Sequence, residues 1–512
     1  MLQQHSGGEN MTSTCDETWA EGLFTADQDQ HVLPWDFPVA DVETLLQDSR
    51  LVTKISCPPP QSSAESTFGG AETAASPSPS QGFDSNPDEL ATPDPDPRTG
   101  ALEGPNGLYT TKISSLMQAE LRNVLTRDRD QLYFDRIHAF TPIVHHGRYS
   151  SWARQAAKTK AQLCLQYTLW TLAASASAHY QDVGDSLYRE ARRLIEELEE
   201  KVKSPATTDI EHIQAWLLLA IHEFTFIDFR RGWISAGRAF RLIQLDCFRD
   251  IDASDAAVVQ TNWIEMEQKR RTFWMAYCLD RFVSLRSGSP LTFDEQNVIC
   301  LPAPESAFQN DQPVLTGYLA EAIVSRDASA TSPFTECIVV ATMTGRALSY
   351  KQLANTRHNA APDFWYRHQS IDTILAQRME AFSLKYAPAL QEADPMLIFI
   401  GMMWRTTILL FSQTVERAIP PADENSFVVS EYASRSSLAA QDIICLATKL
   451  SQLNWFKVRP LTPIPLSLCV ELLGSHHGLD EPPDKKLLVI RELMRSLRSF
   501  NKLGQGLYSY SW

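Results

Sequence analysis

Apolar residues recur at three- and four-residue spacings along most of the chain after residue 107, which is the period of an amphipathic helix. No repeat of 34 or 40 residues accompanies this pattern, which counts against a helical solenoid. The sequence therefore predicts an all-α fold, a large multi-helix domain over residues 108–512. Helices are expected at Tyr109–Leu125, Leu132–Phe140, Ala161–Tyr180, 185–202, Ile210–Phe226, 233–245, 267–287, Val314–Ser325, Thr335–Leu353, Phe364–Tyr386, Pro395–Val415, Ser426–Leu453 and Lys485–Phe500.

Two helix starts carry polar residues that favour capping. Asp185 is expected to cap the helix whose inward side includes Leu187 and Leu194. Thr208 and Glu211 have the spacing of a capping box ahead of the next apolar run.

Residues 267–302 are the most informative stretch, because a basic step leads directly into an apolar and aromatic helix. A helix that is hydrophobic over much of its circumference must lie inside a sizeable protein. Gly288 and Pro290 end it, since glycine tolerates positive φ and proline cannot continue the hydrogen-bond ladder. Buried charges need partners, so Asp280 is expected to pair with a neighbouring arginine.

The same stretch resembles the signature of the fungal-specific transcription factor domain, the helical middle region of fungal zinc-cluster regulators. That signature runs from an Arg-Arg pair through Phe-Trp, an aromatic residue and Leu-Asp-Arg to a Gly-Pro turn and Leu-Pro. Weaker matches lie at Phe140, Pro142, Ile143 and His145, and at Gly237, Ala239 and Arg241, so the signature region spans 132–302. The positions that carry the match are Arg270, Arg271, Phe273, Trp274, Tyr277, Leu279, Asp280, Arg281, Gly288, Pro290, Leu301 and Pro302.

The resemblance implies a nuclear regulator of transcription by RNA polymerase II that controls a metabolic or secondary-metabolite gene set. In such regulators the helical body is a regulatory and oligomerisation module, which forms homo- or hetero-oligomers and is open to metabolite sensing. The alternative class is a helical scaffold or metabolite sensor that does not bind DNA.

Charge is concentrated at the N-terminus, where residues 1–100 hold 17 Asp and Glu against 3 Lys and Arg, out of a formal net charge of −16. Residues 1–54 set bulky apolar residues among these acids, which predicts a disordered acidic arm that contacts a coactivator or the transcription machinery. The residues expected to make such contacts are Trp35, Phe37, Leu45 and Leu46. A tail without a specific partner, or one that docks on its own body, remains open.

Residues 55–107 are rich in Pro, Ser, Gly and Ala and read as a flexible linker. An acidic arm on a nearly neutral body is a poor electrostatic match for DNA phosphates.

The nine cysteines are scattered, and none forms the Cys-x-x-Cys unit typical of zinc sites. Family members usually carry a six-cysteine zinc cluster and a coiled coil before the linker, but residues 1–130 contain only Cys15 and Cys57. We therefore expect no zinc or other cofactor, and DNA contact through a partner. A missing upstream exon, or a regulator that has lost activity and competes for partners, also fits.

Standard catalytic motifs are absent from the sequence, so an enzyme is not expected. Asp246, Asp250, Asp252 and Asp255 are expected to face solvent rather than a metal, and the adjacent His145 and His146 point to opposite sides. The N-terminus lacks the pattern of a signal peptide. The apolar run 396–411 contains Arg405 and is short for a membrane span, so a buried helix is expected there.

Overall fold

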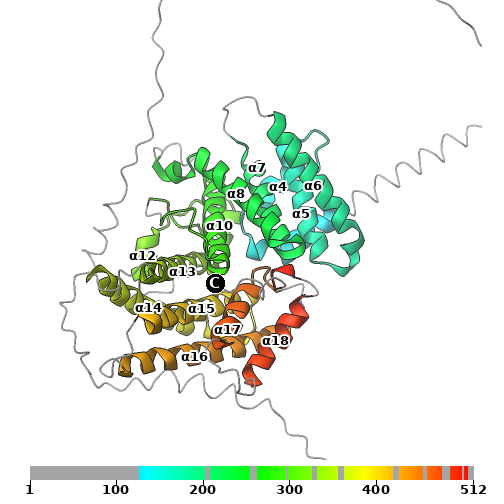
Figure 1. Ribbon diagram of the computed structural model, residues 1–512. Coiled ribbons are helices and arrows are strands. Elements are labelled where there is room, and N and C mark those ends of the chain that lie inside the picture. The colour runs from blue at the N-terminus through cyan, green and yellow to red at the C-terminus, as the bar shows by residue number, and fades with distance from the viewer. Residues whose placement is uncertain are drawn as a thin grey trace, which may run out of the picture. The chain divides into compact units, whose positions relative to one another are not determined.

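The chain is described by a computed structural model (Figure 1), which covers residues 126–201, 208–253, 262–295, 298–325, 331–355, 362–418, 426–453, 458–474, 485–498 and 501–504. Within these ranges every regular element is a helix, apart from an isolated antiparallel bridge between Cys300 and Tyr318. The predicted all-α fold is confirmed. The acidic arm, the linker and the helix predicted at Tyr109–Leu125 lie outside the described residues.

The N-terminal helices form one packed group in which α5 contacts α6 and α7, and α7 contacts α8. Thr159 and Gln162 form a capping box at the start of α5, and the Asp228 carboxylate accepts the Arg231 N–H at 2.8 Å to cap α8. The group comprises a helix at 126–136, η1 (His138–Phe140), α4 (His146–Ala153), α5 (Lys160–Ser175), η2 (Ala178–Tyr180), α6 (Gln181–Lys201), α7 (Ile210–His222), η3 (Glu223–Ile227) and α8 (Phe229–Leu245).

A π-helical turn, η3, joins α7 to α8 and places the fully buried Glu223 between helices. The Glu223 carboxylate accepts hydrogen bonds from the hydroxyls of Tyr188 at 2.8 Å and Ser235 at 2.5 Å. A Cβ at Gly232 would lie 2.6 Å from the Phe224 ring, so α8 approaches this turn closely only because residue 232 is glycine.

Helix α10 (Trp263–Ser287) runs between the N-terminal group and the rest of the described residues (Figure 1). It packs against α7 and α8 on one side and against α13 and α17 on the other. Its side chains are buried all round from Arg270 to Leu285, as the sequence predicted for an interior helix. Gly288 ends it in the left-handed conformation with φ of 70°.

The remaining helices pack around α15, which contacts α13, α14, α16 and α17. Helix α15 is long and apolar enough to span a membrane, but 89% of its most apolar window is buried inside the protein, as expected for a core helix. These elements are η4 (Phe248–Ala253), α11 (Glu305–Gln309), α12 (Leu319–Val324), α13 (Pro333–Asn355), α14 (Pro362–Gln391), α15 (Pro395–Ala418), α16 (Ser426–Ser451), α17 (Pro463–Gly474), α18 (Lys485–Arg498) and η8 (Lys502–Gly504).

Both predicted helix starts were wrong. Helix α6 begins at Gln181, directly after η2, so Asp185 lies inside it. The N-cap of α7 is Asp209, whose side chain makes no capping hydrogen bond, and the Thr208 N–H instead donates to Asp246. The short helix α11 and helix α17 were not predicted.

Candidate functional site

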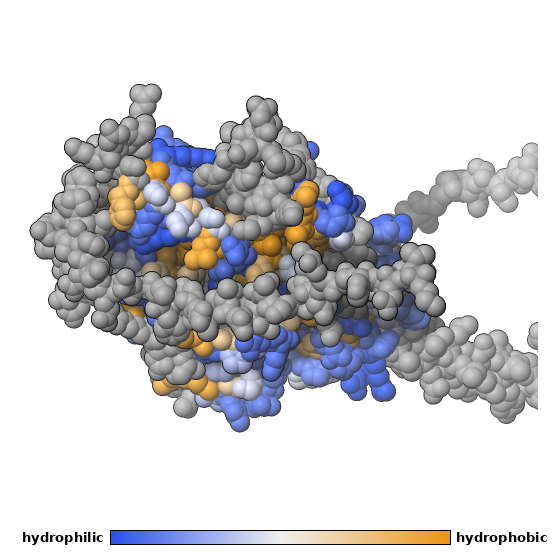
Figure 2. All heavy atoms as spheres, turned by 90° about the horizontal axis from the view of Figure 1, so that it is seen from below, coloured by the Kyte–Doolittle hydropathy of each residue, from blue (hydrophilic) through white to orange (hydrophobic). Residues whose placement is uncertain are grey.

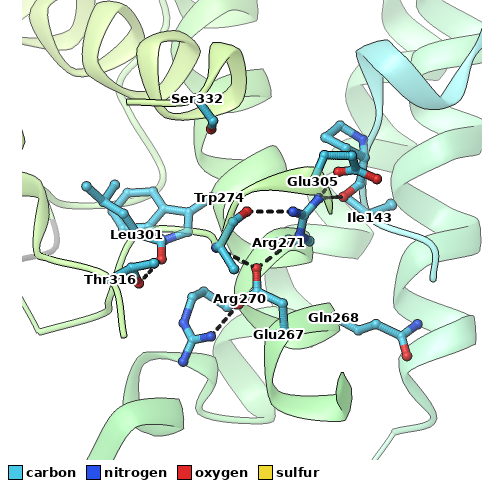
Figure 3. A network of polar contacts seen from close by, with 12 residues as sticks. Ile143, Glu267, Gln268, Arg270, Arg271, Trp274, Leu301, Glu305, Thr316 and Ser332 are labelled. Carbon is cyan, nitrogen blue, oxygen red and sulfur yellow. Dashed lines mark hydrogen bonds and ion pairs between the residues drawn. The ribbon is translucent and has the colours of Figure 1, made fainter. Parts of the chain in front are cut away.

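The charged residues at the start of the signature form a buried network on α10, shown in Figure 3. Glu267 and Arg271 lie one helical turn apart, and their side chains are 0% and 1% exposed. The Arg271 Nε donates to Glu267 Oε1 at 3.0 Å, and the same oxygen accepts the backbone N–H of Ala303 at 2.8 Å. The i, i+4 spacing on the helix therefore sets up the centre of the network.

The Arg271 guanidinium connects three segments that are far apart in the sequence. Its Nη1 donates to the carbonyl of Pro142 at 2.8 Å and to the Glu305 carboxylate, and its Nη2 donates to the carbonyl of Ala303 at 2.7 Å. The guanidinium also lies 4.1 Å from the centre of the Phe308 ring. A planar fork with several donors is suited to holding such divergent acceptors in place.

Arg270 extends the network to the segment before α10. It forms ion pairs with Glu267 and with Asp252 in η4, and the other Asp252 oxygen accepts the Cys300 N–H at 2.7 Å. The expectation that Asp252 faces solvent is therefore wrong, because its side chain is only 11% exposed and bridges an arginine and a backbone amide.

Glu305 closes the network at the surface side. Burial raises the pKa of this carboxyl, but the hydrogen bond from His138 and the charge of Arg271 outweigh it and lower the pKa to about 2. His138 Nε2 lies 2.7 Å from Glu305 Oε1, and the Gln309 amide donates to the same oxygen at 2.8 Å. Glu305 is thus held as a carboxylate that joins η1 to α10.

The aromatic signature residues lie in the core. Trp274 Nε1 donates to the Cys300 carbonyl at 2.8 Å, and the Tyr277 hydroxyl lies 3.0 Å from that of Thr342 on α13. Phe273 contacts the Phe293 ring edge to face, with centroids 5.6 Å apart. These residues attach the extended segment after Gly288 to the helix.

Asp280 is a positioning residue for that segment. Its carboxylate accepts the backbone N–H groups of Thr292 at 3.0 Å and Phe293 at 3.1 Å, and Arg281 Nη1 lies 3.4 Å away. Burial raises the pKa of Asp280, and these backbone hydrogen bonds act against the rise. Arg281 in turn donates to the Phe293 carbonyl at 2.9 Å and covers the Tyr277 ring. The expected pairing with an arginine is present, but the backbone amides are closer partners.

The turn and exit of the signature lie at its edges. Gly288 and Pro290 are exposed, whereas Leu301 and Pro302 are buried. The Leu301 N–H donates to the Gly317 carbonyl at 2.9 Å. The predicted arm contacts Trp35, Phe37, Leu45 and Leu46 lie outside the described residues.

The network is suited to holding segments together rather than to chemistry. Glu267 and Asp252 are each occupied by an arginine and a backbone N–H, so neither is available as a metal ligand or a base. Among the residues that the structure describes, no group of three or more His, Cys, Asp or Glu side chains could hold a metal ion. His145 caps α4 by accepting the Arg148 N–H at 3.0 Å and faces Asp311 with its other ring nitrogen.

Sequence reasoning selected Arg270 and Arg271 but missed three of their partners. Glu267 could have been found, because it stands three and four residues before the two arginines. His138 and Glu305 carried no such signal, since they lie 167 residues apart and meet only in the folded chain.

Comparison with known proteins places these residues in a family pattern. The sequence model of the fungal specific transcription factor domain matches residues 131–342. The pigment biosynthesis transcriptional activator pigB of Monascus ruber is 46% identical over 414 residues, which cover 78% of this chain and 74% of that protein. No solved structure gives a significant match to this chain.

Two further relatives show the same coverage. The citrinin biosynthesis transcriptional activator ctnR of Monascus purpureus is 41% identical over 76% of this chain and 67% of that protein. The azaphilone cluster-specific transcription factor azaR of Aspergillus niger is 37% identical over 66% of this chain and 74% of that protein.

Proposed function

Because this chain belongs to the fungal-specific transcription factor domain family, we propose that it regulates transcription of one secondary-metabolite gene cluster by RNA polymerase II. The observation that carries the proposal is the similarity of most of the chain to proteins named as activators of pigment and citrinin biosynthesis. These relatives are named as transcription regulators and not as enzymes, and proteins of this kind work in the nucleus.

We assign the helical body, residues 108–512, the role of a regulatory and oligomerisation module. In its described part, Leu245, Leu315 and Phe427 are large apolar side chains that are exposed. Figure 2 shows one face on which apolar patches interrupt the polar surface. Such patches are suited to contacts with a second copy of the chain or with another regulator.

Residues 1–54 serve as the activation segment in this proposal, and residues 55–107 as the linker that lets it reach its partner. The combination of acids with Trp35, Phe37, Leu45 and Leu46 supports this assignment. Acidic residues keep the segment solvated, and the bulky residues supply the contacts to a coactivator groove.

DNA contact is proposed to run through a partner protein or through a zinc cluster outside this sequence. Residues 1–130 contain only Cys15 and Cys57, too few for a six-cysteine cluster. Purified protein that shifts promoter DNA by itself would contradict this part of the proposal.

Deletion of the gene in its own fungus tests the regulatory role. Transcripts of one biosynthetic gene cluster should fall strongly in the deletion strain and return when the wild-type gene is restored. Unchanged transcripts of all such clusters under producing conditions would reject the proposal and favour a helical scaffold or metabolite sensor.

Fusion of residues 1–54 to a heterologous DNA-binding domain tests the activation segment separately. The fusion should activate a reporter, and the double variant Trp35→Ala/Phe37→Ala should weaken it. The matched control is Gln28→Ala/Gln30→Ala, which changes two polar residues of the same segment. Equal activity of both double variants would remove the assignment.

A further inference from the structure

Two cysteines meet in the interior where α10 packs against α13. Cys278 and Cys337 are both 0% exposed, and the Cys278 thiol donates a hydrogen bond to the Cys337 sulfur. Both are free thiols in this structure. The function proposed above makes no use of either of them.

A buried arginine faces the same pair. Arg459 is 2% exposed, and its Nη1 donates to the Cys337 sulfur at 3.6 Å. Its other contacts are the Met396 sulfur and the Phe399 ring, whose centre lies 4.2 Å from the guanidinium. Within the described ranges, no carboxylate forms an ion pair with Arg459.

The charge of Arg459 therefore needs a counter-charge from its neighbours. A guanidinium stays protonated even when buried, and a buried charge without a partner is strongly unfavourable. The Cys337 sulfur is the one group in contact with Arg459 that can become an anion, because a thioether and a phenyl ring cannot ionise. The geometry thus favours a Cys337 thiolate beside a neutral Cys278 thiol.

The electrostatics of the pair agree with this arrangement. The hydrogen bond from Cys278 lowers the pKa of Cys337 despite burial, and the charge of Arg459 lowers it further. Burial and the same hydrogen bond raise the pKa of Cys278 well above its usual value. A thiolate next to a thiol is the arrangement that oxidises readily to a disulfide.

We propose that Cys278 and Cys337 are an oxidisable dithiol, which a small hydroperoxide converts into a disulfide that joins α10 to α13. The Cys337 thiolate attacks the peroxide oxygen, so the O–O bond breaks, Cys337 becomes a sulfenic acid, and the released alkoxide or hydroxide takes up a proton. The Cys278 thiol then attacks the sulfenic sulfur and water leaves. In total the two sulfurs lose two electrons, and the peroxide is reduced to an alcohol or water.

Burial restricts which oxidants reach the pair. Neither sulfur has exposed surface, so hydrogen peroxide fits and a bulky aromatic disulfide reagent does not. Cys247 is exposed and serves as an internal comparison, because a bulky reagent reaches it freely.

The test treats the purified full-length protein with hydrogen peroxide and maps its cysteines by mass spectrometry without reduction. The expected product is a cross-link between the peptides of Cys278 and Cys337, with the loss of two hydrogen atoms. The variant Cys278→Ser should stop at a sulfenic acid on Cys337, which dimedone traps. If Cys278 and Cys337 remain thiols while Cys247 is oxidised, the proposal is overturned.

A second measurement on the unaltered protein tests the thiolate itself. Oxidation of Cys337 should be nearly independent of pH between roughly 7 and 8, because it is already ionised, whereas oxidation of Cys247 should rise about tenfold as an ordinary thiol ionises. Arg459→Met should slow the cross-link by about tenfold. An equally steep pH dependence for both cysteines would rule out the Arg459-paired thiolate.

Discussion

Replacement of Arg271 by methionine tests the network on α10 most sharply. The variant keeps a long apolar side chain but removes the donors to Glu267, Glu305 and the carbonyls of Pro142 and Ala303. Glu267, with no exposed surface, then loses one of its two arginines. Breaking a buried ion pair by removing one partner costs about 3–5 kcal/mol, and we expect a loss in this range.

Lys269→Met is the matched control, because Lys269 lies on the same helix and also pairs with a glutamate four residues away. Its ammonium lies 3.1 Å from Glu265, but both side chains are more than a third exposed. Such surface pairs contribute about 0–1 kcal/mol, since water and salt screen them.

Chemical denaturation of the wild type and both variants, followed by circular dichroism at 222 nm, measures the difference. The reasoning requires the Arg271→Met midpoint to fall well below that of Lys269→Met. Two variants within about 1 kcal/mol of each other would show that the buried network does not hold the fold together.

Three further predictions concern neighbouring positions. The folded-state pKa of Glu305 is about 2, below the ~4.3 of an unfolded chain, so its ionisation stabilises the fold above pH ~4.3 and that stabilisation is lost as the pH falls toward 2; Glu305→Gln should flatten acid unfolding in this window, and parallel curves would count against it. Gly288→Ala should cost about 1 kcal/mol because of its φ of 70°, while Gly237→Ala in α8 should gain about 0.5–1 kcal/mol; neither added Cβ meets an atom within 4 Å, so equal melting shifts would contradict the backbone argument. Asp280→Ala should cost about 3–5 kcal/mol and Asp280→Asn less, because the amide oxygen still accepts a backbone N–H; equal melting temperatures for the two would refute this.

Local sequence signals were sufficient for α10 and its end. The apolar spacing after Arg271 requires burial on every side, and Gly288 permits a conformation that other residues avoid. The long C-terminal helices α13 to α16 were also predicted to within a few residues at most ends, because their apolar periodicity is strong.

The misses have physical reasons. Helix α11 has five residues, too few for periodicity to appear. Helix α17 begins at Pro463 within a proline-containing stretch that looked like a loop, although proline is favoured in the first turn of a helix. Asp185 and Thr208 are residues that favour caps, but tertiary packing placed the true starts elsewhere.

The site was predicted in part. The arginines of the signature announced buried charge, and the need for partners followed directly. Which partners they find depends on long-range folding, since Arg271 meets Pro142 across 129 residues and Glu305 across 34. Asp252 was assigned to solvent because its acidic neighbours in the sequence concealed its contact with Arg270.

The central claim is that this chain acts on the promoters of a biosynthetic gene cluster, directly or through a partner. Chromatin immunoprecipitation of the tagged full-length protein, from its own fungus under producing conditions, measures this most directly. The account predicts enrichment upstream of the genes of one cluster, with the protein in the nucleus. A protein that is abundant in these cells but enriched at no promoter would contradict it.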